Sequence, residues 1–255
     1  MAVLDPSSMY GAAAQAPANP TTATGKPGQA VDVQPVIPLA TPAANVFRHV
    51  QPVVLVSLLV LRFKALVADP TAELFNGLPL VAAIQVAYVL LCLPAAGSEQ
   101  ITKKKTKPGE KKRKEEKVIS GVLTAMFSLL LTLTTVLPLH VGFILFGAPL
   151  DNYVFETALV SAHTGLLALF PVFYTRGVDA DSWVALAGLN TPVDEVMGGA
   201  IGCLVGAWLG AVPIPLDWDR DWQRWPVTIV VGMWLGGVVG KGIGGLVVKK
   251  TPASG

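Results

Sequence analysis

Charged residues are scarce in this sequence. Asp, Glu, Lys and Arg make up 14% of the 255 residues, whereas 52% are hydrophobic, and the mean hydropathy is +0.56. Soluble domains usually carry about 25% charged residues, so this composition excludes that class and indicates an integral membrane protein. Only two cysteines occur, Cys92 and Cys203, and both fall inside predicted membrane helices, where we interpret them as packing residues.

Motifs of soluble enzymes and of secreted proteins are also missing. The sequence has no Gly-x-Ser-x-Gly elbow, no phosphate-binding Gly-Lys-Ser/Thr loop, no His-Glu-x-x-His helix and no Cys-x-x-Cys pair. A complete active site is therefore hard to assemble, and we predict no catalytic residue, no metal and no cofactor. The N-terminal residues lack a basic segment followed by an apolar one, so we expect no cleaved signal peptide.

What the sequence does contain is a series of long apolar stretches. A helix needs roughly 20 apolar residues to cross a hydrocarbon core of about 30 Å, and six stretches qualify. They cover residues 46–68, 74–96, 118–146, 152–175, 195–215 and 226–248. The third exceeds one crossing, so we expect it to tilt, to bend at Pro138 or to extend into the interface. Because backbone groups in lipid must be hydrogen-bonded internally, we predict an all-α integral membrane bundle of six transmembrane helices over residues 46–248.

The distribution of basic residues predicts the orientation of this bundle. Within a predicted loop over 97–117, residues 103–117 carry nine cations and three acids. The positive-inside rule places this loop in the cytosol, where we interpret it as a topology determinant rather than a site for anionic lipid or nucleic acid. Six crossings then put both termini in the cytosol, as a disordered Pro/Ala-rich tail over 1–45 and a short tail over 249–255.

Two unbroken four-residue glycine repeats mark the last two predicted helices. They comprise Gly198, Gly202, Gly206 and Gly210 in the fifth helix, and Gly232, Gly236, Gly240 and Gly244 in the sixth. Residues four apart advance only about 40° around a helix, so each series forms a groove without side chains that lets another helix come close. We predict that the two helices pack on each other. A helix of another protein, or a lipid, is the alternative partner for one groove.

A short segment rich in charged residues and tryptophan separates these two predicted helices. We expect a tight hairpin tip at the membrane surface, on the side opposite the basic loop, because tryptophan prefers the membrane-water boundary and charges avoid hydrocarbon. The residues of this predicted tip are Pro213, Pro215, Asp217, Trp218, Asp219, Arg220, Asp221, Trp222 and Trp225.

The alternating acids of the tip invite a metal-site interpretation. Asp217, Asp219 and Asp221 follow an Asp-x-Asp-x-Asp pattern that could bind a hard cation. The pattern lacks the glycine and the distal glutamate of a calcium loop, and Arg220 and Arg224 are close enough in sequence to neutralise the acids. We therefore favour an Asp-Arg network flanked by interfacial tryptophans.

We place the ionisable residues His140, Glu156 and His163 inside the membrane. Such residues are candidates for function by default. Glu156 and His163 are seven residues apart and share one helix face, so they could relay protons or bind a ligand. Two histidines and one glutamate without close spacing make a poor metal site. Polar contacts between helices are an equally good interpretation.

Two segments resemble a known family. Residues 205–226, which contain the predicted tip, closely resemble the signature hairpin of the PIG-F family. Residues 139–157, with His140, Phe146-Gly147-Ala148-Pro149-Leu150 and Glu156-Thr157, resemble the second recognisable stretch of that family. The resemblance covers the third to the sixth predicted helices.

The resemblance implies a small multi-pass subunit of the endoplasmic reticulum membrane that acts in glycosylphosphatidylinositol (GPI) anchor biosynthesis. Members of the family stabilise large catalytic ethanolamine phosphate transferases, which modify mannoses of the GPI precursor on the lumenal side and carry the catalytic metals themselves. For this chain it implies a non-catalytic partner subunit. Its expected partners are the transferase, membrane lipids and the GPI precursor, and no nucleic acid.

Two other interpretations stay open. The chain could be a lipid-linked transferase that uses Asp217 and Asp219 on a metal, or a lipid-handling bundle in which Glu156 and His163 line a headgroup path. An enzyme needs a lumenal loop that encloses a polar donor, whereas the longest segment on that side has about ten residues.

Overall fold

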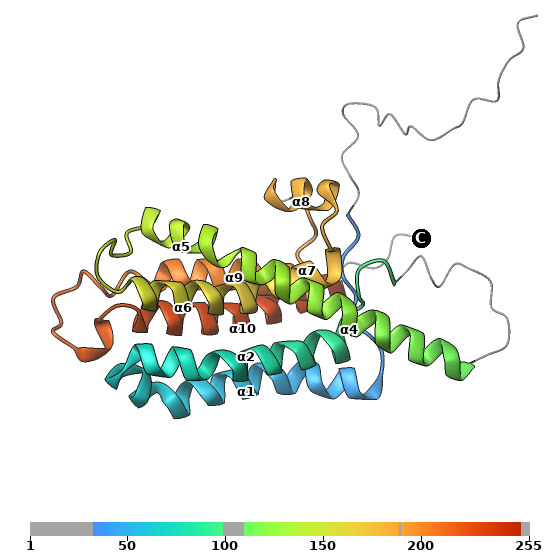
Figure 1. The fold of residues 1–255 in the computed structure, drawn as a ribbon, viewed down its shortest axis with the longest axis horizontal. Coiled ribbons are helices and arrows are strands. Elements are labelled where there is room, and N and C mark those ends of the chain that lie inside the picture. The colour runs from blue at the N-terminus through green and yellow to red at the C-terminus, as the bar shows by residue number, and fades with distance from the viewer. Residues whose placement is uncertain (1–32, 99–109, 189, 251–255) are drawn as a thin grey trace, which may run out of the picture. The chain divides into compact units, whose positions relative to one another are not determined.

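The computed structural model describes residues 33–98, 110–188 and 190–250, and every regular element in these ranges is helical (Figure 1). Most of the tail predicted over 1–45, most of the predicted basic loop and residues 251–255 lie outside the described residues. The elements are α1 (Pro42–Ala68), α2 (Pro70–Cys92), α4 (Glu110–Thr134), α5 (Val136–Leu145), α6 (Val154–Thr164), a π-helical turn (Gly165–Leu169), α7 (Phe170–Arg176), α8 (Ala180–Ala187), α9 (Glu195–Gly210), a 3-10 turn (Asp221–Gln223) and α10 (Val227–Lys250).

Helices α1 and α2 form a hairpin with Asp69 as the single residue between them. Each helix starts with a side-chain cap followed by proline, which lacks the N–H that would otherwise be left without a partner. Thr41 accepts from the Ala44 N–H at 3.1 Å, and Asp69 accepts from the Ala72 N–H at 3.0 Å. Both helices begin four residues earlier than predicted, at Pro42 and Pro70.

Five helical segments have the length and composition to cross a membrane. They are Pro42–Ala68, Pro70–Cys92, Val118–Leu145, Val154–Arg176 and Val227–Val248. The remaining predicted span, 195–215, is helical only in α9, whose 16 residues extend about 24 Å. It stops at Gly210 because Pro213 and Pro215 cannot continue a helix. Among the described residues, five helices rather than the predicted six therefore reach membrane length.

Proline shapes two of the spanning segments. The expected bend near Pro138 falls at Thr135, which separates α4 from α5. Proline clashes with the carbonyl four residues before it, here that of Thr134, so the break precedes the proline. Similarly, Pro171 follows the π-helical turn Gly165–Leu169, inside a segment that was predicted as one regular helix.

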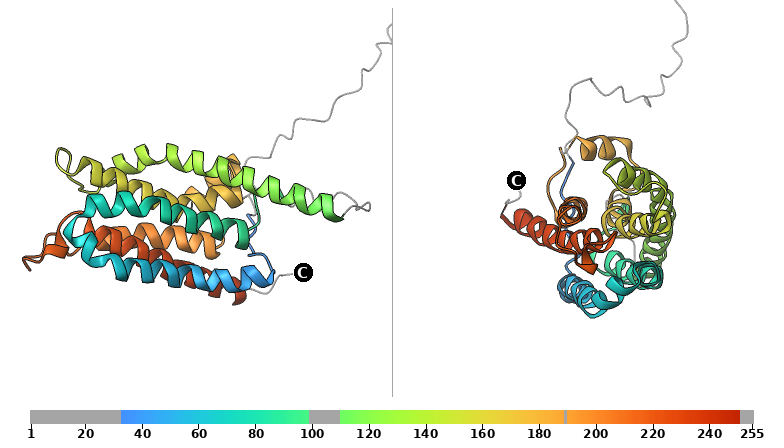
Figure 2. Two further views of the ribbon diagram at one scale, coloured as in Figure 1. Left: turned by 60° about the horizontal axis from the view of Figure 1, so that its bottom comes forward. Right: turned by 90° about the vertical axis from the view of Figure 1, so that its left-hand side faces the viewer.

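The bundle is organised around the segment Val154–Arg176. In the 18-residue apolar window of this span 72% of the residues are buried, against 17% in that of Val118–Leu145. The segment α6–α7 therefore lies inside the bundle, whereas α4 and α5 expose apolar side chains such as Leu133 and Leu137. Figure 2 shows the arrangement of these helices. The start of α1 and the end of α10 lie at the same end of the bundle, because Lys241 Nζ donates to Gln51 Oε1 at 2.7 Å. The turn before α10 lies at the other end, where Arg224 Nη2 donates to the Ala68 carbonyl at 2.8 Å.

A short helix, α8, was not predicted. Asp179 begins it by accepting hydrogen bonds from the backbone N–H and the hydroxyl of Ser182, at 2.9 and 2.8 Å. These two bonds hold the pKa of Asp179 below its ordinary value. The Trp183 side chain packs against Phe173 with 4.8 Å between the ring centroids, which ties α8 to α7.

Candidate functional site

The backbones of α9 and α10 touch along the two glycine series, a contact that we call the glycine seam. The glycines face one another in antiparallel order, as the pairs Gly198–Gly240, Gly202–Gly236 and Gly206–Gly232, while Gly210 faces Thr228 and Gly244 faces Asp194. A methyl group on any of these eight glycines would overlap a backbone carbonyl oxygen of the opposite helix or of its cap residue. All eight glycines singled out in the sequence therefore lie on one interface between two adjacent helices (Figure 1).

Three neighbouring glycines, Gly199, Gly237 and Gly242, leave room for a methyl group. A methyl group on Gly199 would lie 3.6 Å from Lys241 Cβ, and one on Gly237 would lie 3.6 Å from Cys203 Cβ, both ordinary contact distances. A methyl group on Gly242 would meet nothing within 4 Å. Close backbone approach maximises van der Waals contact and brings Cα–H groups near carbonyl oxygens, which is how small residues hold membrane helices together.

The hairpin tip is held in shape by Gln223, a residue that the sequence analysis did not single out. Its Nε2 donates to the carbonyls of Pro213 and Leu216 at 2.8 and 2.7 Å, and its Oε1 accepts from the Arg220 N–H at 3.0 Å. Gln223 is 7% exposed, so these bonds give hydrogen-bond partners to a buried amide side chain. Asp219 completes the turn in the left-handed region, at φ 48°.

The expected Asp-Arg network is wrong. Asp217, Asp219 and Asp221 are all exposed, and their side chains make neither a hydrogen bond nor an ion pair with any described residue. Arg224 instead donates to the carbonyls of Val67 and Ala68, where it caps the end of α1. The three aspartates are thus exposed, whereas Arg224 contacts the end of α1.

The three tryptophans of the tip have different environments. Trp218 is 52% exposed and packs against Trp222, with 5.8 Å between the ring centroids. Trp225 is half-buried against Phe143 of α5, in an edge-on arrangement with centroids 6.5 Å apart. Only Trp218 therefore keeps a largely free aromatic surface next to the exposed acids.

His140, Glu156 and His163 do not form one site. Glu156 accepts from the Thr71 hydroxyl at 2.7 Å, and His163 Nε2 lies 3.0 Å from the Leu74 carbonyl, so both make contacts from α6 to α2. His140 lies on α5 and has no hydrogen bond to either of them. Among the described residues, no three His, Cys, Asp or Glu side chains gather as metal ligands.

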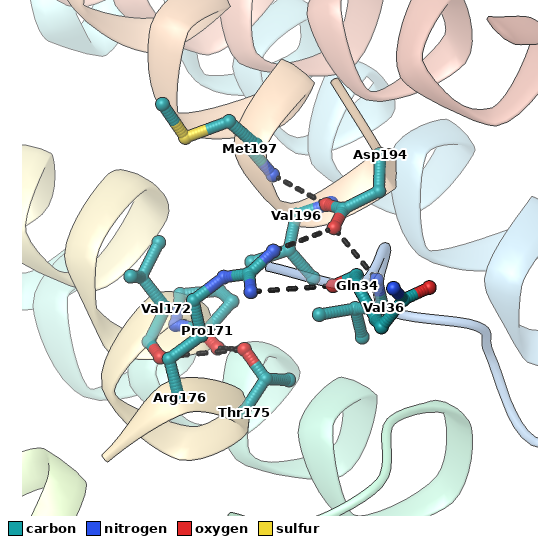
Figure 3. Close-up of polar contacts among 9 residues, drawn as sticks. All are labelled: Gln34, Val36, Pro171, Val172, Thr175, Arg176, Asp194, Val196 and Met197. Atoms are coloured by element: carbon teal, nitrogen blue, oxygen red, sulfur yellow. Dashed lines mark hydrogen bonds and ion pairs between the residues drawn. The ribbon is translucent and has the colours of Figure 1, made fainter. Parts of the chain in front are cut away.

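A buried ion pair that the sequence analysis missed joins three segments at the opposite end of the bundle from the tip (Figure 3). Asp194 is fully buried; its Oδ2 accepts from Arg176 Nη2 at 3.0 Å and from the Val36 N–H at 2.8 Å. Its Oδ1 caps α9 by accepting from the N–H groups of Val196 and Met197 at 2.9 and 2.8 Å. An aspartate directly before an apolar helix is a capping signal that could have identified this residue.

A second polar cluster lies beside it, between α1, α2, α9 and α10. Arg48 forms an ion pair with Glu195, the first residue of α9. Lys241 donates to Gln51, which donates to Gln85 at 3.1 Å, and the Lys241 ammonium lies 3.6 Å from the centroid of the Tyr88 ring. The isolated lysine within the glycine-rich sixth apolar stretch was the signal for this cluster.

Comparison with known proteins assigns these features to one family. The GPI biosynthesis protein family Pig-F matches residues 50–245. The chain is 48% identical to glycosylphosphatidylinositol anchor biosynthesis protein 11 of Neurospora crassa over 214 residues, which cover 84% of this chain and 79% of that protein. It is 39% identical to the protein of that name from Aspergillus fumigatus over 262 residues, covering 90% and 86%. With the Saccharomyces cerevisiae protein of that name it shares 46% identity over 101 residues, which cover 40% of this chain and 41% of the yeast protein.

No solved structure matches the chain. The family match extends over the described helices from α1 to α10 and includes the glycine seam, the tip and the buried ion pair. It covers well over half of the sequence, and the Neurospora and Aspergillus relatives are aligned over most of their own length. The chain therefore belongs to the PIG-F family of GPI biosynthesis proteins.

Proposed function

We propose that this chain acts in GPI anchor biosynthesis as a non-catalytic membrane subunit, which holds a large catalytic ethanolamine phosphate transferase in the endoplasmic reticulum membrane. Membership of the PIG-F family supports the pathway. The observation that carries the subunit role is the glycine seam, because two helices in backbone contact form a rigid hairpin that holds its tip in one place. A fixed tip loses little conformational entropy when a partner binds it.

The exposed residues of the tip are suited to docking. Asp217, Asp219 and Arg220 are exposed, carry charge of both signs and have no intramolecular partner for their side chains among the described residues, and Trp218 adds an apolar ring. Aromatic residues are enriched in protein interfaces, where they supply much of the binding energy. We propose that this surface contacts the transferase.

The proposed orientation puts the tip in the lumen. The start of α1 and the end of α10 share one end of the bundle, which fits two cytosolic termini, and the tip lies at the other end. The basic residues 103–117, which include the first eight residues of α4, support the same orientation by the positive-inside rule. In this orientation, the tip faces the side on which the transferases are expected to modify the GPI precursor.

The transferase alternative has less support. An enzyme that transfers a polar group must enclose its donor, and ligand pockets usually occupy about 300–1,000 Å³. Asp217 and Asp219 are exposed on a short turn and are not gathered with a third potential metal ligand among the described residues. We therefore propose a binding role for these acids.

Co-purification of the full chain with the transferase from detergent tests the subunit role. We expect the double variant Asp217→Ala/Trp218→Ala to retain about tenfold less transferase, equivalent to about 1.4 kcal/mol, with unchanged thermal stability of the chain itself. The matched control is Asp151→Ala, which removes an exposed acid from the α5–α6 loop at the same end of the bundle.

Three results would contradict the proposal. The wild-type chain could migrate alone at native abundance, or the double variant could retain as much transferase as the control. An intact complex without transfer activity in Asp217→Ala would instead favour the enzyme interpretation.

A further inference from the structure

A cleft of about 280 Å³ lies on the side of α10 that faces α1 and α2, away from the glycine seam. Its lining includes buried side chains from four helices: Leu59 of α1, Leu74 of α2, His163 of α6, and Val230 and Trp234 of α10. Its rim includes Leu80 on α2, which is 48% exposed. The cleft is therefore a mainly apolar recess within the membrane-length part of the bundle, with the His163 imidazole in its lining.

One ion pair stands at the rim of this recess. Arg62 Nε donates to Glu73 Oε1 at 2.8 Å, and Arg62 Nη2 donates to Glu73 Oε2 at 2.6 Å. The Arg62 side chain is 53% exposed, and the Glu73 side chain is 13% exposed. Arg62 lies six residues before the end of α1, about 9 Å along the helix, and α1 is longer than the hydrocarbon core requires. The pair is thus at the depth where lipid headgroups meet acyl chains.

We propose that this cleft binds a zwitterionic glycerophospholipid, with one acyl chain in the apolar recess and the headgroup at Arg62 and Glu73. The phosphate would pair with the guanidinium, and the headgroup cation would pair with the carboxylate. A headgroup that carries both charges satisfies both side chains, whereas an anionic headgroup leaves Glu73 facing like charge.

The rim and the volume of the cleft favour a lipid over a protein helix. The ion pair at the rim offers one cation and one anion, which a headgroup that carries both charges matches. The volume also falls just below the range of about 300–1,000 Å³ for sites that enclose a complete small ligand. One acyl chain therefore enters, while the rest of the lipid stays in the bilayer.

A glycine in the wall makes the site testable. A methyl group on Gly77 would meet only His163 Cε1, at 3.9 Å, so alanine fits there without strain. A leucine at the same position would extend into the cleft and occupy the space of the chain. Gly77→Ala and Gly77→Leu therefore form a matched pair that differs in cleft volume and leaves the charges unchanged.

Native mass spectrometry of the full chain in detergent measures the lipid directly. The chain is incubated with equal amounts of phosphatidylcholine, phosphatidylethanolamine and phosphatidylglycerol that carry identical acyl chains. We expect one retained lipid, with each zwitterionic species retained about tenfold more than phosphatidylglycerol, both in the wild-type protein and in Gly77→Ala. Gly77→Leu should lose this lipid while its thermal unfolding remains cooperative.

A charge variant keeps the test decisive if Gly77→Leu fails to fold. Glu73→Gln leaves Arg62 without its counter-ion, so phosphatidylglycerol should become the favoured lipid. Equal retention of all three lipids by the wild-type chain, or no retention at all, would overturn the proposal. So would undiminished retention by a folded Gly77→Leu variant, or a co-purifying protein that this variant alone releases.

Discussion

Replacing Gly236 by alanine tests the glycine seam with the smallest available change. The new methyl group would overlap the Gly202 carbonyl oxygen and lie 2.8 Å from Gly206 Cα. Both atoms belong to the backbone of α9, so no side chain can rotate away and the two helices must separate. Overpacking of this kind costs about 1–3 kcal/mol, and the cost increases when the backbone has to move.

A thermal-unfolding measurement in detergent can resolve this cost. For a chain of this size, each kcal/mol lowers the midpoint by about 2–4 °C, so we expect a decrease of about 2–12 °C. The control is the adjacent Gly237→Ala, whose methyl group would lie 3.6 Å from Cys203 Cβ. It adds the same atom to the same helix and should leave the midpoint unchanged or raise it slightly, because alanine favours helix by up to about 1 kcal/mol over glycine.

Comparing the two variants shows whether stability depends on the close packing of α9 and α10 or on the helix propensity of glycine. Loss of stability in both would attribute the effect to glycine in general, for example to helix flexibility. Equal stability of Gly236→Ala and Gly237→Ala would refute the close approach of the two backbones. Only a selective loss in Gly236→Ala fits the seam.

Two further predictions concern the ends of the bundle. Asp194→Ala removes both the cap of α9 and the partner of Arg176. We expect a loss of about 3–5 kcal/mol in the free energy of unfolding, or no folded protein, because a buried charge is left unpaired. The control in the same chemical-denaturation assay is Asp179→Ala, which removes the exposed cap of α8 and should destabilise the chain far less. Gln223→Ala leaves the Pro213 and Leu216 carbonyls without their donor, so limited proteolysis should cleave the tip several-fold faster while the helical content measured by circular dichroism stays the same.

Apolar stretches in the sequence located the helices because lipid leaves the backbone few alternatives. Their ends were less accurate, since caps and prolines set them rather than hydropathy. Asp69 starts α2 four residues before the predicted boundary, and Pro213 and Pro215 end the predicted fifth span early. A window of about 20 residues averages over such local signals.

The sequence predicted the glycine contact between α9 and α10 correctly, but it did not predict the contacts of the charged residues. The glycine repeats were visible because glycine weakens a helix, and a series of glycines on one helix face is therefore typical of close packing against another backbone. The prediction of an Asp-Arg network at the tip was wrong. Charges that are adjacent in sequence suggest pairing, but Arg224 binds carbonyl groups at the end of α1 instead. The pairing of Arg176 with Asp194 depends on which segments the fold brings together, and no local pattern contains that information.

The short length of α9 leads to a last prediction, because it makes this helix depend on α10. The apolar part of α10 covers 22 residues, enough to cross the membrane alone, whereas α9 has 16 residues and extends about 24 Å of the roughly 30 Å required. Opening the seam should therefore displace α9 and leave α10 in place.

Cys203 on α9 and Cys92 on α2 are both free and 0% exposed, so they report on the two regions separately. In Gly236→Ala we expect maleimide to label Cys203 several-fold faster than in the wild-type chain, while the labelling rate of Cys92 stays unchanged. The control is Gly242→Ala on the same helix, whose methyl group would meet nothing within 4 Å and should alter neither rate. Faster labelling of both cysteines would mean that the whole bundle loosens, and α9 would then not be the dependent element.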